Sequence, residues 1–185
     1  MVGTEIVMAG FGGQGVLLAG KILAHAAMNC GMEVSWLPSY GPEMRGGTAN
    51  VIVCISPKPI GSPLITNPRV LVAMNLPSLD KFARKVKPSG LILINASLID
   101  KNVDRDDCVV LQVKARELAK EAGNNRASNM VKLGAYVGAS GIIPAEAVEE
   151  QIEQEFGEKK PETIPSNIAA FRAGLAEGKK VTASV

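Results

Sequence analysis

The sequence predicts an α/β protein, a three-layer α/β/α sandwich built around a mostly parallel but mixed β-sheet. A glycine-rich turn at residues 10–15 joins a β-like run to a long apolar helix, as in a strand–helix–strand crossover. Two continuous apolar runs, residues 70–74 and 91–95, are typical of strands covered on both faces. Strands that alternate with helices in this way favour a parallel sheet between two helical layers.

The predicted strands are short β-rich runs between turn signals, at residues 4–9, 33–37, 48–55, 70–74, 91–95 and 108–113. Only a polar loop, residues 38–47, separates the second run from the third. A connection without a helix suits antiparallel neighbours, so we expect at least one antiparallel pair.

The predicted helices are apolar periodic runs at residues 15–30, 79–86, 115–122, 130–140, 144–156 and 167–176. The first is apolar around most of its circumference, apart from a stripe formed by Lys21, His25 and Asn29. Such a helix is expected to be buried on more than one side, which makes it a candidate for contact with a partner chain. Gly134 and Gly138 would allow close approach of another backbone, and packing against the sheet is favoured over a subunit contact.

Composition indicates one globular domain, residues 1–185, with 46% hydrophobic and 21% charged residues. The net charge of +2 and the aromatic content of 4% argue against nucleic acid as a partner. No apolar run reaches the roughly 18 residues of a membrane span, and the first residues lack signal-peptide features. We therefore expect a cytoplasmic protein with no membrane partner.

The three cysteines, Cys30, Cys54 and Cys108, are isolated in the sequence, and His25 is the sole histidine. Iron–sulfur clusters and structural zinc usually need four such ligands, so we expect no cluster or metal held by this chain alone. All three cysteines are predicted to be buried free thiols. No residue is expected to be catalytic.

Gly10, Gly12 and Gly15 have the G-x-G-x-x-G spacing of a phosphate-binding turn in front of a helix. A nicotinamide or flavin site would also need a carboxylate at the end of the second strand, and residues 36–40 contain none. A Walker A site would need Lys-Ser/Thr after Gly15, where Val16 stands. The turn alone therefore does not identify its ligand.

The candidate binding site combines two glycine-bearing loops, expected at the carboxyl ends of adjacent strands, where α/β proteins bind ligands. Its residues are Gly12, Gly13, Gln14, Gly15, Tyr40, Arg45, Gly46, Gly47 and Thr48. The Arg45 guanidinium can bind phosphate or carboxylate through two parallel hydrogen bonds. The alternative is that Arg45 pairs with Glu43 and that the glycines only permit turns.

Three ordered motifs resemble the gamma subunit of the 2-oxoacid:ferredoxin oxidoreductases, the family of pyruvate, 2-oxoglutarate and 2-oxoisovalerate oxidoreductases. The first is GFGGQGV at residues 10–16, followed by AGKIL at residues 19–23. The second is YGPEMRGGTA at residues 40–49, and the third is NMVKLGA at residues 129–135. The likeness extends from the first strand to the last helix.

The resemblance implies a subunit of a complex that decarboxylates a 2-oxoacid, reduces ferredoxin and transfers the acyl group to coenzyme A. It implies thiamine diphosphate between alpha and beta subunits, and iron–sulfur clusters in the beta subunit, a delta subunit or fused domains. This chain would bind no cofactor alone but would help to bind coenzyme A as co-substrate. Two alternatives stay open: the related beta chain of indolepyruvate oxidoreductase, and a stand-alone Rossmann-like dinucleotide-binding protein.

Overall fold

The computed structural model describes residues 3–41 and 47–181. Its six-stranded sheet has the order β2-β3-β1-β4-β5-β6. The strands are β1 (Thr4–Phe11), β2 (Glu33–Tyr40), β3 (Thr48–Ser56), β4 (Val70–Ala73), β5 (Leu91–Asn95) and β6 (Val109–Val113). β3 runs antiparallel to both of its neighbours, whereas β1, β4, β5 and β6 are mutually parallel. The predicted mostly parallel, mixed sheet is confirmed.

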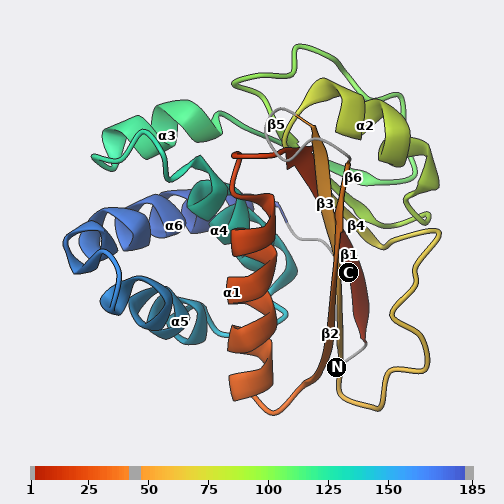
Figure 1. The fold of residues 1–185 in the computed structure, drawn as a ribbon. Helices are drawn as coiled ribbons and strands as arrows, with labels where there is room; N and C mark the ends of the chain where they lie inside the picture. The colour runs from red at the N-terminus through yellow and green to blue at the C-terminus, as the bar shows by residue number, and fades with distance from the viewer. Residues whose placement is uncertain (1–2, 42–46, 182–185) are drawn as a thin grey trace.

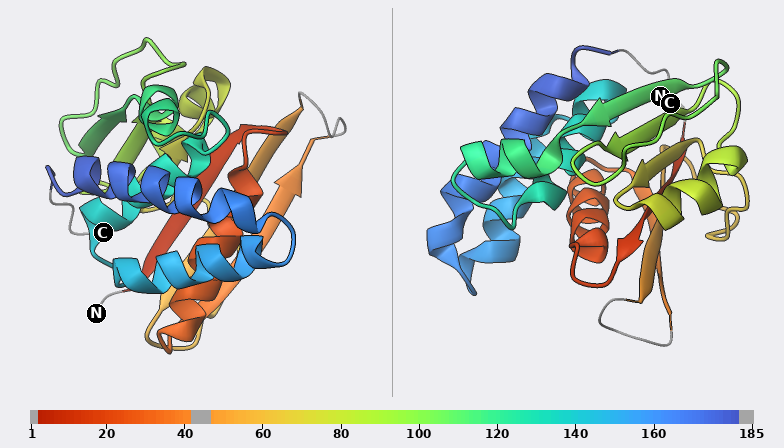
Figure 2. Two further views of the ribbon diagram at one scale, coloured as in Figure 1. Left: turned by 90° about the vertical axis from the view of Figure 1, so that its left-hand side faces the viewer. Right: turned by 90° about the horizontal axis from the view of Figure 1, so that it is seen from above.

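The two faces of the sheet are covered unequally (Figure 1). One face carries α1 (Val16–Asn29), α3 (Ala115–Glu121), α4 (Ser128–Ser140), α5 (Ala145–Gly157) and α6 (Ile164–Gly178). The other face carries α2 (Leu76–Phe82) and the short 3₁₀ helix η1 (Ala83–Lys85); α2 contacts β4 and β1, and β2 lies away from it. A second 3₁₀ helix, η2 (Pro161–Thr163), leads into α6. Figure 2 shows α5 and α6 as the outermost elements of the thicker layer.

β3 lies between β1 and β2, so the strands that end in the two predicted loops are not adjacent. That expectation was wrong because β3 pairs along its length with β1, from Thr4–Ile55 to Phe11–Thr48, and with β2 on its other side. The start of β3 still reaches the glycine turn, because Phe11 and Thr48 are partners at the end of the ladder.

β2 continues through Pro38 to Tyr40, three residues beyond the predicted end of the strand. Gly41 N donates to Thr48 O at 2.7 Å, which fixes the alternation of hydrogen bonds along the β2–β3 ladder. Backbone nitrogens point alternately to the two sides of a strand, and Gly41 N points towards β3. The nitrogen of Pro38, an odd number of residues away, therefore faces the open side of the sheet, where no ladder hydrogen bond is lost. Proline is therefore compatible with this edge strand, and it weakens the edge as a template for another strand.

The core is divided by the sheet into two clusters. The larger lies under α1, α4 and α6, and includes Ile6, Met8, Val72 and Leu93 from the strands. The smaller lies under α2 and is formed by alternate residues of the same strands, such as Leu71 and Ile92. This explains the continuous apolar runs in β4 and β5, because every residue of both strands is buried.

α4 and α6 cross in close backbone contact through glycines on both helices. A Cβ at Gly134 would lie 2.8 Å from Leu175 N, and a Cβ at Gly174 would lie 2.6 Å from Val131 C. The predicted close approach at Gly134 and Gly138 is confirmed as internal, but the partner is α6 and not the sheet. Gly174 and Gly178 supply the matching pair on α6, also four residues apart.

The polar stripe of α1 is where α5 packs. Lys21 Nζ donates to Glu155 Oε2 at 2.8 Å, and Asn29 Nδ2 donates to Gln151 Oε1 at 3.3 Å. α1 is therefore covered by the sheet on one side and by a helix of the same chain on another, as its apolar circumference predicts. His25, between these two contacts in sequence, is exposed.

Several expected boundaries differ from the structure for local reasons. α2 begins three residues early because Asn75 Oδ1 accepts from Ser78 N at 2.9 Å, a side-chain cap of the first turn. The prediction that all three cysteines are buried is wrong for Cys30, which is exposed where α1 ends and the chain turns at Gly31. Cys54 is buried and Cys108 is half-buried, and all three thiols are free.

Among the described residues, no helix is long and apolar enough to cross a membrane.

Candidate ligand site at the glycine turn

The glycine turn joins the end of β1 to the start of α1 through two left-handed residues. Gly13 has φ +93° and Gly15 has φ +71°, conformations that side chains with a Cβ rarely adopt. Gln14 N donates to Phe11 O at 3.1 Å and closes the turn. The first bond of the helix runs from Ala19 N to Gly15 O, so the N–H groups of residues 16–18 have no partner within the helix.

The side chain of Gln14 supports the turn from within. Its Oε1 accepts from Phe11 N at 2.7 Å, and its Nε2 donates to Met74 O at 3.5 Å. Gly10 provides the space, because a Cβ there would come within 2.9 Å of Met74 Cβ. Gln14 therefore links the ends of β1 and β4, and it does not line the hollow beside the turn.

The second predicted loop meets the turn through the start of β3. Gly12 N donates to Gly47 O at 2.9 Å, so this N–H is already satisfied within the protein. Thr48 pairs with Phe11 across the β1–β3 ladder, and its carbonyl accepts from Gly41 N. These contacts tie the turn to the end of the β2–β3 hairpin.

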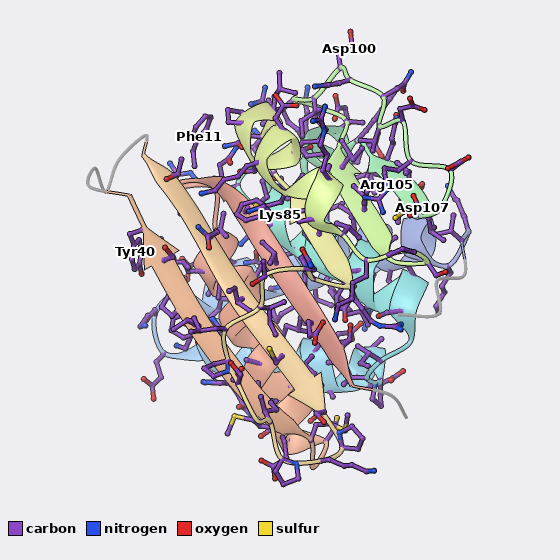
Figure 3. The ribbon with its side chains drawn as sticks, turned by 90° about the vertical axis from the view of Figure 1, so that its right-hand side faces the viewer. Phe11, Tyr40, Lys85, Asp100, Arg105 and Asp107 are labelled. Atoms are coloured by element: carbon purple, nitrogen blue, oxygen red, sulfur yellow. The ribbon has the colours of Figure 1, made fainter. Side chains whose placement is uncertain are left out.

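A hollow of about 260 Å³ lies between the glycine turn and this hairpin. Phe11 and Tyr40 line this hollow, and 36% and 59% of their surfaces are exposed. Figure 3 shows both residues at the same end of the sheet, where β1 and β2 end. The hollow is lined by Phe11, Gly12, Gly13, Gly15, Val16, Leu17, Leu18, Tyr40, Gly47, Thr48 and Ala49. Unpartnered helix N–H groups, partly exposed aromatic rings and mainly apolar walls suit a ligand with an anionic group and an apolar or aromatic portion.

The structure brings together six of the nine predicted site residues. They line the hollow and are Gly12, Gly13, Gly15, Tyr40, Gly47 and Thr48. Gln14 acts as an internal brace, and Arg45 and Gly46 lie outside the described residues. Sequence reasoning missed Phe11, although its position at the end of a strand and beside the glycines was a usable signal.

The third motif, residues 129–135, reaches the turn from α4. Asn129 Nδ2 donates to Gly15 O at 3.4 Å, which links the start of α4 to the start of α1. One turn further along α4, Lys132 is 1% exposed and forms no ion pair with any described residue. Burial lowers the pKa of Lys132 to about 7. The motif therefore contributes a contact with the turn, a buried amine and, at Gly134, the crossing with α6.

The geometry differs from that of a dinucleotide site. In such a site the second strand lies next to the first and ends in a carboxylate for the ribose hydroxyls. Here β3 intervenes, and β2 ends at Tyr40 without a carboxylate at that end. The chain therefore has the glycine turn of a dinucleotide site but lacks the adjacent second strand and the carboxylate that would bind the ribose.

Residues 5–177 match the family described as pyruvate ferredoxin/flavodoxin oxidoreductase. The chain belongs to this family. Among its relatives, the ketoisovalerate oxidoreductase subunit VorA of Methanothermobacter marburgensis is 40% identical over 95% of the chain. The match covers 37% of VorA, so the chain spans about a third of the length of that relative.

Two solved structures share the fold throughout. The gamma subunit of a keto/oxoacid ferredoxin oxidoreductase from Geobacter sulfurreducens is 29% identical, with a TM-score of 0.81 over 96% of this chain and 99% of that one. The 2-oxoglutarate:ferredoxin oxidoreductase from Magnetococcus marinus, solved with 2-oxoglutarate, coenzyme A and succinyl-CoA, is 27% identical. Its TM-score is 0.88 over 100% of this chain and 32% of that one. The α/β fold and the family resemblance of the three motifs are thereby confirmed.

Proposed function

We propose that this chain is the gamma-type subunit of a 2-oxoacid:ferredoxin oxidoreductase and that its glycine turn helps to bind coenzyme A. The complex would convert a 2-oxoacid and coenzyme A to acyl-CoA and CO₂, and would pass two electrons to ferredoxin. The observation that carries the proposal is the hollow at the turn, where unpartnered N–H groups of α1 meet Phe11 and Tyr40. A relative that aligns with the whole chain was solved with coenzyme A, which supports this ligand.

The chemistry of coenzyme A fits the two kinds of wall in the hollow. Its diphosphate suits the start of α1, where the helix N-terminus favours negative charge. Its adenine and pantetheine portions suit partly exposed rings such as Phe11 and Tyr40. The hollow, about 260 Å³, accommodates part of the molecule, and alpha and beta subunits would supply the remaining contacts.

The redox cofactors are proposed to lie in partner subunits. Among the described residues, no group of three His, Cys, Asp or Glu side chains could hold a metal ion. As the family resemblance implies, thiamine diphosphate and iron–sulfur clusters would lie in alpha, beta or delta chains, with ferredoxin as the external acceptor. The isolated chain would be inactive.

A contact surface for a partner chain is proposed on α1 and the edge strand β2. Met28 is 57% exposed and Trp36 is 38% exposed, although both are large and apolar. They line a hollow of about 220 Å³ together with Ala24 and His25. Its walls are mainly apolar, as in the centre of a protein interface.

The test is reconstitution of the complex by co-expression with candidate alpha and beta chains. Assembly and the 2-oxoacid- and coenzyme A-dependent reduction of ferredoxin are measured with and without this chain. Tyr40→Ala should raise the KM for coenzyme A by about tenfold, as expected for loss of an aromatic contact, and leave the KM for the 2-oxoacid unchanged. Leu64→Ala is a matched control, because Leu64 is 71% exposed and does not line the hollow.

Arg45→Ala is expected to raise the KM for coenzyme A more than that for the 2-oxoacid. The opposite pattern would assign Arg45 to the substrate carboxylate. If omission of the chain changes neither assembly nor coenzyme A dependence, the subunit role is wrong. Tight NADH or FAD binding by the isolated chain would support the dinucleotide-binding alternative instead.

A further inference from the structure

A second hollow, of about 270 Å³, lies on another side of the glycine turn, between α1 and the beginnings of α4 and α6. It shares Gly13, Gly15 and Leu18 with the first hollow, so the turn forms a wall of both. Its remaining lining residues are Asn124, Arg126, Asn129, Phe156, Lys160, Thr163 and Asn167. None of its lining residues is acidic.

Two cations face this hollow without a counter-charge. Arg126 and Lys160 line it, and neither side chain forms an ion pair or hydrogen bond with any described residue. In a hollow beside α2, two of the three lining cations are paired: Lys101 with Asp80, and Arg105 with Asp107 (Figure 3 labels Arg105 and Asp107). The third cation, Arg84, lines that hollow together with the acidic Asp104. The hollow between α1, α4 and α6 differs from it in having two cations and no acidic residue in its lining.

Three helix N-termini converge on the same hollow. Gly15, Asn129 and Thr163 lie at the starts of α1, α4 and α6, and none of these helices has a side-chain cap. The N–H groups of residues 16–18 at the start of α1 have no partner within the helix, and such groups favour an anion. The start of α6 contributes little, because Ile164 N donates to Pro161 O and Pro165 has no N–H. Asn129 is 94% buried by its surroundings, yet its amide lines the hollow and makes one long bond of 3.4 Å, to Gly15 O.

We propose that this cationic hollow binds a phosphate or diphosphate group. Arg126 would bind two phosphate oxygens through its guanidinium, Lys160 would add a second cation, and Asn129 would donate an amide hydrogen bond. Because Gly13 and Gly15 line both this hollow and the one with Phe11 and Tyr40, one ligand could contact both hollows at the turn. Assignment of the phosphate to coenzyme A rests on the proposed function; free pyrophosphate is the other source of the same chemistry.

The anion site is tested on the full chain by calorimetric titration with inorganic pyrophosphate at low ionic strength. Arg126→Gln and Lys160→Gln should each weaken binding by about tenfold, as for loss of one charge-assisted contact, and added salt should weaken wild-type binding. Arg116→Gln and Lys159→Gln are the matched controls, because they remove the same charges outside the hollow. Circular dichroism checks that the variants fold. Equal affinity in the site variants and the controls, or no pyrophosphate binding by the wild type, overturns the inference.

The source of the phosphate is tested in the assembled complex by the KM for coenzyme A. An increase of about tenfold in Arg126→Gln and Lys160→Gln, with the KM for the 2-oxoacid unchanged, supports a coenzyme A phosphate in this hollow. Weakened pyrophosphate binding with an unchanged KM for coenzyme A overturns that assignment and leaves free pyrophosphate as the ligand. If Tyr40→Ala alone raises the KM for coenzyme A, the proposed function stands and the cationic hollow has no part in it.

Discussion

Asn129 occupies the space that any side chain at Gly15 would need. A Cβ built at Gly15 would come within 2.8 Å of Asn129 Cγ, and the Asn129 amide donates to the Gly15 carbonyl. Two residues that are 114 positions apart in sequence therefore fix each other. The contact couples the start of α4 to the conformation of the ligand-binding turn.

Gly15→Ala should destabilise the protein through both strain and overlap. The left-handed φ of +71° costs a residue with a Cβ about 1–2 kcal/mol, and overlap with Asn129 adds to this. The loss should be smaller when Asn129→Ala is also present, because the overlap is removed and the φ strain remains. Urea unfolding of the wild type, both single variants and the double variant measures this coupling. Additive effects would contradict the contact.

The crossing of α4 and α6 depends on glycine on both sides. Gly134→Ala and Gly174→Ala should each cost about 3 kcal/mol of unfolding free energy, although alanine is the better helix former. Backbone atoms of the facing helix fill the position of the new methyl group, and backbone cannot move aside as a flexible side chain can. Gly157→Ala is the control: it lies at the end of α5 with nothing within 4 Å of its Cβ, so its effect should stay within about 1 kcal/mol. Equal effects at positions 134 and 157 would exclude the close crossing.

Lys132 should give the protein a measurable dependence of stability on pH. Its pKa is about 7 when folded and near 10.4 when unfolded, so between these values the unfolded chain binds one more proton. The contribution of Lys132 to stability therefore rises with pH, by about 1.4 kcal/mol per pH unit across this window. Lys132→Met should be more stable than the wild type at pH 7.5, and this advantage should shrink towards pH 9.5.

The measurement is the free energy of unfolding of both proteins at several pH values. Their difference isolates Lys132, because the other titrating groups are common to both. A difference that does not vary with pH would show that the amine stays charged in the folded protein. Lys159→Met serves as the control, because Lys159 is exposed and its removal should leave the pH profile unchanged.

The three thiols should react at different rates. Cys30 is exposed, whereas burial raises the pKa of Cys54 and Cys108 and lowers their thiolate fraction. A thiol reagent at pH 7.5 should modify one cysteine quickly in the native chain, and all three after unfolding. Cys30→Ser should abolish the fast phase; a fast phase that persists in this variant would contradict the exposure of Cys30.

Much of the framework can be predicted from local sequence. The apolar runs of β4 and β5, the glycine turn, and most helix limits follow from periodicity and turn chemistry over a few residues. The family of the chain was also readable from three short motifs. Six of the predicted site residues come together because they lie in two segments that meet where β1 and β2 end and β3 begins.

Other features depend on pairing between distant segments, which local patterns do not encode. β3 lies between β1 and β2, so the ends of β1 and β2 are one strand apart, and pairing with β3 extends β2 through Pro38 to Tyr40. The hydrogen bond from Gln14 Nε2 to Met74 O and the exposure of Cys30 likewise depend on the packed fold.

By itself, the sequence determined the alternation of strands and helices, the glycine turn and the absence of a carboxylate at residues 36–40. Only the tertiary structure decided that Asn129 contacts Gly15 and that Gly134 packs against the helix containing Gly174. It also decided that Arg126 and Lys160 line one hollow that has no acidic residue. The physical reason is that backbone conformation responds to neighbours along the chain. Burial, overlap and charge pairing respond to neighbours in space, and these residues meet across separations of tens to more than a hundred positions.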